Sequence, residues 1–437
     1  MRPALMLVAA LVAACDPHTA PADKAAPAAA QAPPSAPADR AAPAAAQAPP
    51  SAPADEATSP ASALASPPAS DPAPARSPAP SQGPAAPLPK PTVAASPPPP
   101  EGRTSTLDRD EELRLFPGLA RPVEGGWEVT LRAWVFEPEA DSWRRKAAVE
   151  ALRAALDLPA DATESAIFRE RAAAFLVDNE RGEEVIVEIG GTRHALAHTA
   201  ANGQSETTLL LADAAITCPT TPVRALLRPG DARRFEGALH CLDPGSRSVV
   251  SDIDDTIKVS EVRDKDALLR NTFLREPEAV PGLAAVYRAW ADAGARFHYV
   301  SASPWQLDDA LSRFMERAGF PAGTHHLKSF RWKDSTFFAL FQDPEVYKRA
   351  ILEPLLRAAP GRRFVLVGDS GERDPEIYGA LARDFPDQVD AIYIRDVTGE
   401  AADADRYRSA FAGVPAQRWA LFHDAAELPG PAALARR

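Results

Sequence analysis

The 437-residue sequence predicts an α/β protein in which a doubly wound parallel sheet follows a β-rich region and a long unfolded segment. From residue 246 onward, apolar strands alternate with amphipathic helices, as in parallel sheets covered by helices on both faces. Between residues 104 and 245, short segments of alternating polarity predominate instead. The first hundred residues hold more than half of the 46 prolines and almost no aromatic residues, a composition that cannot form a packed core.

The N-terminus has the pattern of an export signal. Arg2 precedes an apolar run, Ala4 to Ala14, that is too short to span a bilayer. Its ending, Val-Ala-Ala-Cys, resembles a bacterial lipobox, which predicts a lipoprotein signal peptide over residues 1–15 and a lipid anchor on Cys15. The alternative is ordinary signal cleavage beside an incidental cysteine. Either reading predicts an exported protein, and the lipobox reading places it on a membrane of the bacterial cell envelope, in the periplasm or at the cell surface.

Residues 16–103 are predicted to be a disordered Ala/Pro-rich linker. The fifteen residues from Ala25 to Asp39 recur word for word as Ala41 to Asp55, but the unit is too short and polar to form a solenoid. The formal net charge of −12 argues against a nucleic-acid partner. Two further cysteines, Cys218 and Cys241, are expected to form either a disulfide or a pair of buried thiols.

Residues 104–245 are predicted to form a β-rich domain with a helical insertion. The segment 126–136 alternates like a strand, and its candidate core residues are Trp127, Val129, Leu131 and Trp134. Further strands are expected at 183–189, 206–211 and 225–227, and helices at 142–156 and 164–177. No group of catalytic residue types appears in this region, and its sequence does not indicate a ligand.

Residues 246–437 are predicted to form the parallel sheet. Strands are expected at 248–252, 296–300 and 364–367, and helices at 282–293, 306–318 and 345–358. In sheets of this type, ligands bind at the carboxyl ends of the strands. The residues that follow these strands are therefore the candidates for function.

Acidic and hydroxyl side chains follow each of the three strands. Asp252 and Asp254 end the first, Ser301 follows the second, and Asp369 and Asp374 follow the third. Carboxylates held close together repel one another unless a cation lies between them, and Mg²⁺ prefers carboxylates together with phosphate oxygens and water. An EF-hand is excluded because its sixth and twelfth positions would be an isoleucine and an arginine.

A lysine is expected to reach the same edge of the sheet. Lys348 shares a helical stripe with Ile351, Leu352 and Leu355, where a charged residue is out of place unless its ammonium reaches an anionic site. The aspartates, serine and lysine together resemble the four-part signature of haloacid-dehalogenase-like (HAD-like) phosphatases. The strings SDIDDTIK, YVSASPW and FVLVGDSGERDPEIY resemble, more closely, the catalytic domain of App1-type (DUF2183) phosphatidate phosphatases.

This resemblance implies a role for each matching residue. Asp252 is expected to attack phosphorus and form an aspartyl-phosphate, and Asp254 to act as the acid and base. Ser301 and Lys348 would bind the phosphoryl group. The Mg²⁺ ligands are expected to be Asp252, Asp254 (through its backbone carbonyl) and Asp369. Asp374 is expected to support the metal indirectly, through a second layer of contacts.

The expected activity is hydrolysis of phosphatidic acid to diacylglycerol and phosphate, with an anionic lipid phosphate as substrate. One alternative is a HAD-like phosphatase that acts on another phosphomonoester, and the other is a non-catalytic, lipid-binding surface lipoprotein. Between residues 319 and 342, basic and aromatic residues interleave, including His325, His326 and Lys328. This segment is expected to be either a membrane-facing lid or a core segment with solvated charges.

Overall fold

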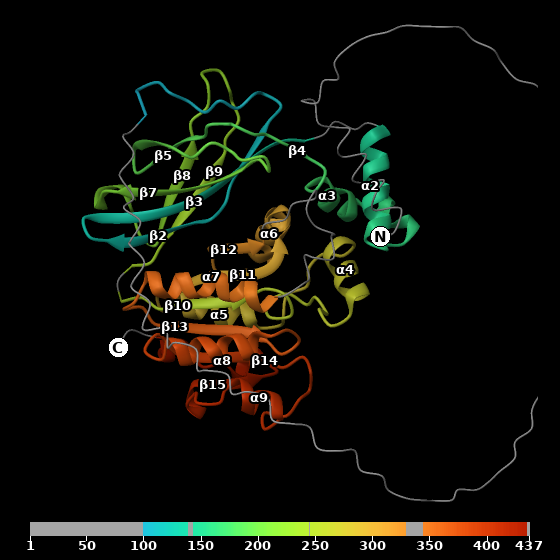
Figure 1. Ribbon diagram of the computed structural model, residues 1–437, viewed down its shortest axis with the longest axis vertical. Coiled ribbons are helices and arrows are strands. Elements are labelled where there is room, and N and C mark those ends of the chain that lie inside the picture. Colours follow the sequence, from blue (N-terminus) through green and yellow to red (C-terminus); the bar gives the residue numbers. More distant parts are fainter. Residues whose placement is uncertain (1–98, 139–142, 244, 329–343, 435–437) are drawn as a thin grey trace, which may run out of the picture. The chain divides into compact units, whose positions relative to one another are not determined.

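The computed structural model describes residues 99–138, 143–243, 245–328 and 344–434 (Figure 1). These residues belong to one compact unit that contains two β-sheets. The predicted signal peptide, Cys15 and nearly all of the predicted linker lie outside the described residues. Within the described part of the chain, every helix is too short or too polar to cross a membrane.

The first sheet is formed by residues 112–241 and is mostly antiparallel. Its central path runs β1-β3-β2-β9-β8-β5-β6, and β4 and β7 also pair with β3. The strands are β1 Glu112–Leu115, β2 Gly118–Val123, β3 Gly126–Glu137, β4 Asp178–Asn179, β5 Ile186–Ile189, β6 Thr192–Ala195, β7 Gln204–Leu211, β8 Thr220–Ala225 and β9 Glu236–Cys241. Its core contains Val129 and Leu131 of β3, both fully buried, as their alternation in the sequence predicts.

The second sheet is parallel throughout, with the order β12-β11-β10-β13-β14-β15. Its strands are β10 Ser248–Asp252, β11 Arg296–Pro304, β12 Gly323–Lys328, β13 Phe364–Asp369, β14 Val389–Arg395 and β15 Trp419–Phe422. The chain starts at the centre with β10, adds β11 and β12 on one side, and then adds β13, β14 and β15 on the other. This reversal places the carboxyl ends of β10, β11 and β13 side by side at the switch point of the sheet.

Helices cover both faces of the parallel sheet, so the fold is doubly wound as predicted. Val249 and Val365 point to the face covered by α5 Leu283–Asp292 and α6 Asp308–Ala318. The next residue of each strand points to the opposite face, covered by α7 Pro344–Ala358, α8 Asp374–Asp384 and α9 Asp405–Ala410. Burial on both faces explains why these strands read as continuous apolar runs.

Three further α-helices of the described residues are inserted between strands. They are α2 Trp143–Ala155 and α3 Ala166–Ala173, which follow β3, and α4 Lys265–Phe273, which follows β10. Phe168 of α3 packs edge-on against Phe273 of α4, with ring centroids 6.4 Å apart. The inserted helices of the β-rich region therefore share a hydrophobic cluster with α4 of the parallel-sheet region.

The structure confirms the fold class and differs from the sequence in some element boundaries. The strand expected at 225–227 is β8, which ends at Ala225 and pairs with β9 on one side and β5 on the other. Pro222, which is exposed in the middle of β8, made the first half of this strand difficult to predict from the sequence. The helix expected at 164–177 is shorter, because Ser165 caps the N-terminus of α3 and a separate 3₁₀ turn precedes it.

Cys218 and Cys241 both carry free thiols. Cys218 is exposed and Cys241 is buried. Burial raises the pKa of the Cys241 thiol, and the neighbouring thiol of Cys218 raises it further. The two neighbouring thiols are therefore not joined by a disulfide in this structure, and only that of Cys241 is buried.

Candidate active site

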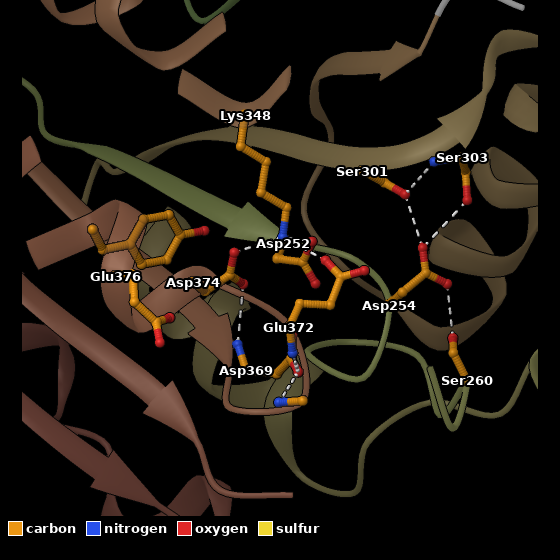
Figure 2. A network of polar contacts seen from close by, with 12 residues as sticks. Asp252, Asp254, Ser260, Ser301, Ser303, Lys348, Asp369, Glu372, Asp374 and Glu376 are labelled. Carbon is orange, nitrogen blue, oxygen red and sulfur yellow. Dashed lines mark hydrogen bonds and ion pairs between the residues drawn. The ribbon is translucent and has the colours of Figure 1, made fainter. Parts of the chain in front are cut away.

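The candidate site lies at the carboxyl edge of the parallel sheet, where two strands and one helix bring carboxylates close together (Figure 2). Asp252 is the last residue of β10, Asp369 the last residue of β13, and Asp374 the first residue of α8. Each offers a carboxylate oxygen within 4.8 Å of the other two, and all three residues are buried. The structure thus brings together three of the four predicted metal-site residues.

Lys348 reaches this cluster from α7 and is fully buried. Its Nζ lies 2.8 Å from Oδ1 of Asp252, 2.6 Å from Oδ1 of Asp374 and 3.1 Å from Oε2 of Glu372. Burial lowers the pKa of Lys348, but these carboxylates outweigh that effect and raise the pKa well above its ordinary value. The ammonium therefore stays charged, and its place on the apolar stripe is explained.

The loop after β13 is shaped by hydrogen bonds to two carboxylates. Oδ1 of Asp369 accepts hydrogen bonds from the backbone N–H groups of Gly371 (2.6 Å) and Glu372 (3.1 Å). Oδ2 of Asp374 accepts one from the backbone N–H of Asp369 (3.2 Å). A Cβ at Gly368 would lie 2.3 Å from Oδ2 of Asp374, so this close approach requires glycine.

Two carboxylate oxygens in the cluster have no hydrogen-bond partner. They are Oδ2 of Asp252 and Oδ2 of Asp369, and both are buried. Buried carboxylate oxygens need a partner, and hard cations such as Mg²⁺ take oxygen ligands from one or two carboxylates. Asp374 differs, since its two oxygens contact Lys348 and the Asp369 backbone. The donor set thus fits a divalent cation held by Asp252 and Asp369 and supported by Asp374.

Asp254 belongs to a separate hydrogen-bond network. Its carboxylate accepts hydrogen bonds from the hydroxyls of Ser260 (2.8 Å), Ser301 (2.8 Å) and Ser303 (3.2 Å), and lies 2.7 Å from Nζ of Lys258. Figure 2 shows these hydroxyls converging on Asp254, on the other side of Asp252 from Asp374. The carboxylate of Asp254 is therefore not in the three-residue cluster, and the backbone route to a metal predicted for it stays a prediction.

The two aspartates of the first strand end have opposite pKa shifts. Burial raises the pKa of Asp252 well above its ordinary value; Lys348 opposes this, and Asp374 and Asp369 add to it. Burial also acts to raise the pKa of Asp254, but Lys258 and the serine hydroxyls outweigh it and lower the pKa to about 2. Asp254 is thus a carboxylate at neutral pH, which is the form a base must have, but its low pKa makes it a weak base. An acid role requires a change in these contacts.

The β-rich region contacts the chain just beyond the serines that hold Asp254. Trp305, which follows β11, packs edge-on against Phe116 at 4.6 Å between ring centroids, and the guanidinium of Arg132 lies 4.8 Å from the centre of the Trp305 ring. Nearby, Nη2 of Arg114 lies 2.8 Å from Oδ2 of the buried Asp308 at the start of α6. The first sheet therefore helps to fix the segment that carries Ser301 and Ser303.

The structure adds residues that the sequence interpretation left without a role. Glu372 pairs with Lys348, Lys258 and Ser260 hold Asp254, and Arg406 donates a hydrogen bond to the backbone carbonyl of Ser370 (2.5 Å). Lys258 and Glu372 lie inside the motif strings, and their charge is the feature of the sequence that could have indicated a role for them. Arg406 lies outside those strings, and no feature of the sequence indicated its role.

The basic and aromatic segment predicted between residues 319 and 342 is described only up to Lys328. Nδ1 of His325 lies 2.6 Å from Oδ1 of Asp308, and His326 contacts the hydroxyl of Thr324. Both histidines therefore have partners within the fold, as the core alternative expects. The aromatic residues of this segment, from Trp332 to Phe341, lie outside the described residues.

Part of the chain is similar to a known protein family. Residues 247–396 match the family model described as "Phosphatidate phosphatase APP1, catalytic domain". All three residues of the carboxylate cluster lie within the matched range, which supports an App1-type domain there.

Two curated proteins are similar to part of the chain. Phosphatidate phosphatase APP1 of Saccharomyces cerevisiae is 34% identical over 169 residues, which are 37% of this chain and 28% of that protein. An uncharacterized protein of Schizosaccharomyces pombe is 32% identical over 163 residues, 36% of this chain and 26% of that protein. The chain thus spans little more than a quarter of the length of these relatives.

Among solved structures, a putative β-phosphoglucomutase from Thermotoga maritima superimposes with a TM-score of 0.26 at 11% identity, over 41% of this chain and 95% of that one. This likeness is too low to carry an argument about fold or function.

Proposed function

We propose that this protein is a Mg²⁺-dependent phosphatidate phosphatase, which hydrolyses phosphatidic acid to diacylglycerol and phosphate through an aspartyl-phosphate on Asp252. The observation that carries the proposal is the pair of buried, unpartnered oxygens of Asp252 and Asp369 beside Lys348. The family match over residues 247–396 and the printed name of the yeast relative support the reaction and the substrate.

Asp252 is the nucleophile in this proposal. Its Oδ1 is held by Lys348 at 2.8 Å, which orients the carboxylate and leaves Oδ2 without a partner. Attack of a carboxylate oxygen on phosphorus forms the acyl phosphate and breaks the bond to the leaving alkoxide. Lys348 then neutralises charge on the phosphoryl group as well as on the nucleophile.

In this proposal Asp254 transfers protons, and the serine hydroxyls bind the phosphoryl oxygens. Asp254 takes a proton from the water that hydrolyses the acyl phosphate; its low pKa keeps it unprotonated before this step, and a weaker contact with Lys258 would make it a stronger base. For it to protonate the leaving oxygen in the first step, its contact with Lys258 must weaken when substrate binds. Ser301 donates to Asp254 in this structure and would turn to donate to the substrate phosphate.

The metal would be held by Asp252 and Asp369, with Asp374 keeping Lys348 and the Asp369 backbone in place. When bound, Mg²⁺ would neutralise charge on the phosphate and offset the repulsion among the carboxylates. The pKa of Asp369 is raised, mainly by burial and next by the neighbouring Asp374. A cation in the cluster would oppose both effects.

We further propose that the enzyme is exported and anchored to a membrane of the cell envelope through lipidated Cys15. This proposal rests on the sequence of residues 1–15, and the linker over 16–103 would let the catalytic domain reach lipid in the same membrane. Mass spectrometry of the mature N-terminus would test it. A diacylated Cys15 is expected, and an unmodified residue at that position would contradict the anchor.

The decisive measurement is phosphate release from phosphatidate in mixed micelles, with Mg²⁺ and with EDTA, for the wild type and Asp252→Asn. Glycerol 3-phosphate serves as the soluble phosphomonoester. Release that needs Mg²⁺ and Asp252 and prefers phosphatidate supports the proposal. A preference for the soluble ester would keep the enzyme class and change the substrate. Equal release by wild type and Asp252→Asn would contradict the mechanism.

A further inference from the structure

The β-rich sheet contains a second charged site, of opposite sign to the carboxylate cluster. A cavity of about 280 Å³ is lined by four arginines, Arg193, Arg224, Arg233 and Arg234, and by one carboxylate, Asp231. The lining has a formal excess of three positive charges, in a chain whose formal net charge is −12. None of these residues belongs to the carboxylate cluster, and none was assigned a role in the sequence analysis.

Strand pairing gathers these arginines from separate parts of the chain. Arg193 lies on β6 and Arg224 on β8, and both are register partners of Glu188 on the strand between them, β5. Arg233 and Arg234 come from the segment that joins β8 to β9. The cavity therefore lies at the β6 end of the sheet order.

Two of the four guanidinium groups are already paired within the protein. Arg224 Nη2 lies 2.6 Å from Oε1 of Glu188. Arg233 Nη2 lies 2.6 Å from Oδ2 of Asp231, and the same guanidinium donates to the backbone carbonyls of Asp108 and Glu111. Because Arg233 lowers the pKa of Asp231 to about 2, this carboxylate is charged at neutral pH and its pairing is complete.

The other two groups, Arg193 and Arg234, have no hydrogen-bond or ion-pair partner among the described residues. For Arg193 the lack of a partner is costly, since its Nη1 is buried without any acceptor. A guanidinium cannot lose its proton to escape this cost, and it has no acceptor of its own. An unpaired, buried guanidinium N–H that lines a cavity is best satisfied by an anion inside that cavity.

We propose that this cavity binds the phosphate group of an anionic ligand, either a free phosphomonoester or the headgroup of an anionic lipid. Guanidinium groups bind phosphate oxygens in pairs, with a geometry that a single halide ion does not match. The volume lies at the lower end of the range for ligand pockets, so it admits a headgroup and excludes acyl chains. Leu226 and Leu227, both half-buried, also line the cavity and suit the carbon atoms next to the phosphate.

The test measures binding with turnover switched off. Full-length protein carrying Asp252→Asn is titrated in EDTA, so that the carboxylate cluster holds no metal and repels phosphate. Isothermal titration with inorganic phosphate and glycerol 3-phosphate forms the soluble arm. Sedimentation with phosphatidylcholine vesicles, with and without 10 mol% phosphatidate (roughly one charge per ten headgroups), forms the lipid arm.

Two variants remove the unpaired guanidiniums, Arg193→Met and Arg234→Gln, alone and together. Arg363→Met is the matched control, since it removes the same charge from an exposed arginine of the parallel sheet that pairs with Asp390. The double variant is expected to weaken binding at least tenfold, which is about 1.4 kcal/mol. Arg363→Met is expected to leave it unchanged. If Arg193→Met fails to fold, the exposed Arg234→Gln carries the test.

The two arms identify the source of the phosphate. Loss of soluble-phosphate binding in the double variant supports a free phosphomonoester, and loss confined to phosphatidate vesicles supports a lipid headgroup. Equal binding by the double variant and the wild type, or no binding of any probe by the wild type, overturns the proposal. Phosphatase activity is measured separately, with Mg²⁺ and with protein that keeps Asp252. Failure of either proposal therefore leaves the other standing.

Discussion

The carboxyl edge of the parallel sheet and the arginine cavity of the β-rich sheet differ in sign but share one feature. At the first, one lysine pairs with three carboxylates, and two buried carboxylate oxygens have no partner. At the second, arginines outnumber the carboxylate that lines the cavity, and a buried guanidinium nitrogen has no partner. Each site combines a charge imbalance with a buried, unpartnered atom, and on this basis we propose that a cation completes the first and an anion the second.

The largest expected effect is on the chemistry of the acidic site. Asp252→Asn removes the attacking carboxylate and is expected to reduce phosphate release by on the order of 10⁴-fold or more. Phosphate release at saturating Mg²⁺ measures it. Asp292→Asn, at an exposed position of α5, is the control and is expected to keep full activity. Residual activity within tenfold of the wild type would remove Asp252 from the nucleophile role.

Removing the single cation of the acidic site should destabilise the protein. Lys348→Met leaves the carboxylates of Asp252, Asp374 and Glu372 without their shared partner, and loss of one side of a buried ion pair costs about 3–5 kcal/mol. Denaturant unfolding measures this change. Lys146→Met, at an exposed position of α2, should change stability little. Unfolding of Lys348→Met at the wild-type midpoint would show that the ammonium contributes nothing there.

Mg²⁺ should stabilise the folded protein by binding at the acidic site. Mg²⁺ at a hundredfold excess over its dissociation constant is expected to raise the free energy of unfolding by about 2.7 kcal/mol. Asp369→Asn should abolish this gain, because it removes one of the two unpartnered oxygens. Thermal unfolding against EDTA provides the measurement. A gain that survives in Asp369→Asn would place the metal elsewhere.

The pH dependence of stability should involve both sheets. Burial lowers the pKa of His240 on β9 and of His326 on β12 to about 4. In the unfolded chain these imidazoles bind protons below about pH 6.5, whereas in the folded protein they bind them near pH 4. Stability is therefore full above about pH 6.5 and falls as the pH drops from there towards 4; the loss at pH 5 is about 2 kcal/mol per histidine.

Chemical denaturation at pH 7 and pH 5 measures the loss. The variants His240→Gln and His326→Gln should each flatten the pH profile, since glutamine does not titrate. A profile of either variant as steep as that of the wild type would assign the loss to other groups.

The smallest expected effect separates the unpaired and paired arginines of the cavity. Arg193→Met removes a guanidinium whose buried Nη1 lacks a partner. It is expected to raise the free energy of unfolding slightly, by less than about 1 kcal/mol. Arg233→Met breaks contacts to Asp231 and two carbonyls and should cost about 1–2 kcal/mol. Equal losses in the two variants would contradict the difference in pairing between them.

Much of the acidic site could be predicted from the sequence because its residues follow apolar strands directly. Strand β10 begins and ends where the apolar run Ser248–Asp252 predicts, and Lys348 was identified by a charge on an apolar stripe. The network around Asp254 could not be predicted. It depends on a turn in which Asp255 adopts a φ of 55° and accepts hydrogen bonds from the backbone N–H groups of Ser260 and Val262. No periodic pattern encodes such a turn.

By itself, then, the sequence determined the fold class, the acidic strand ends and the resemblance to App1-type phosphatases, because strand and helix periodicity and contiguous motifs are local properties of a chain. The tertiary structure decided which charges meet. It showed that Asp254 is held by Lys258 and three serines while Asp252 keeps an unpartnered oxygen, and it built the arginine cavity from strands that pair across β5. Pairing register and burial depend on contacts between distant segments, and these set both the partner and the pKa of each group.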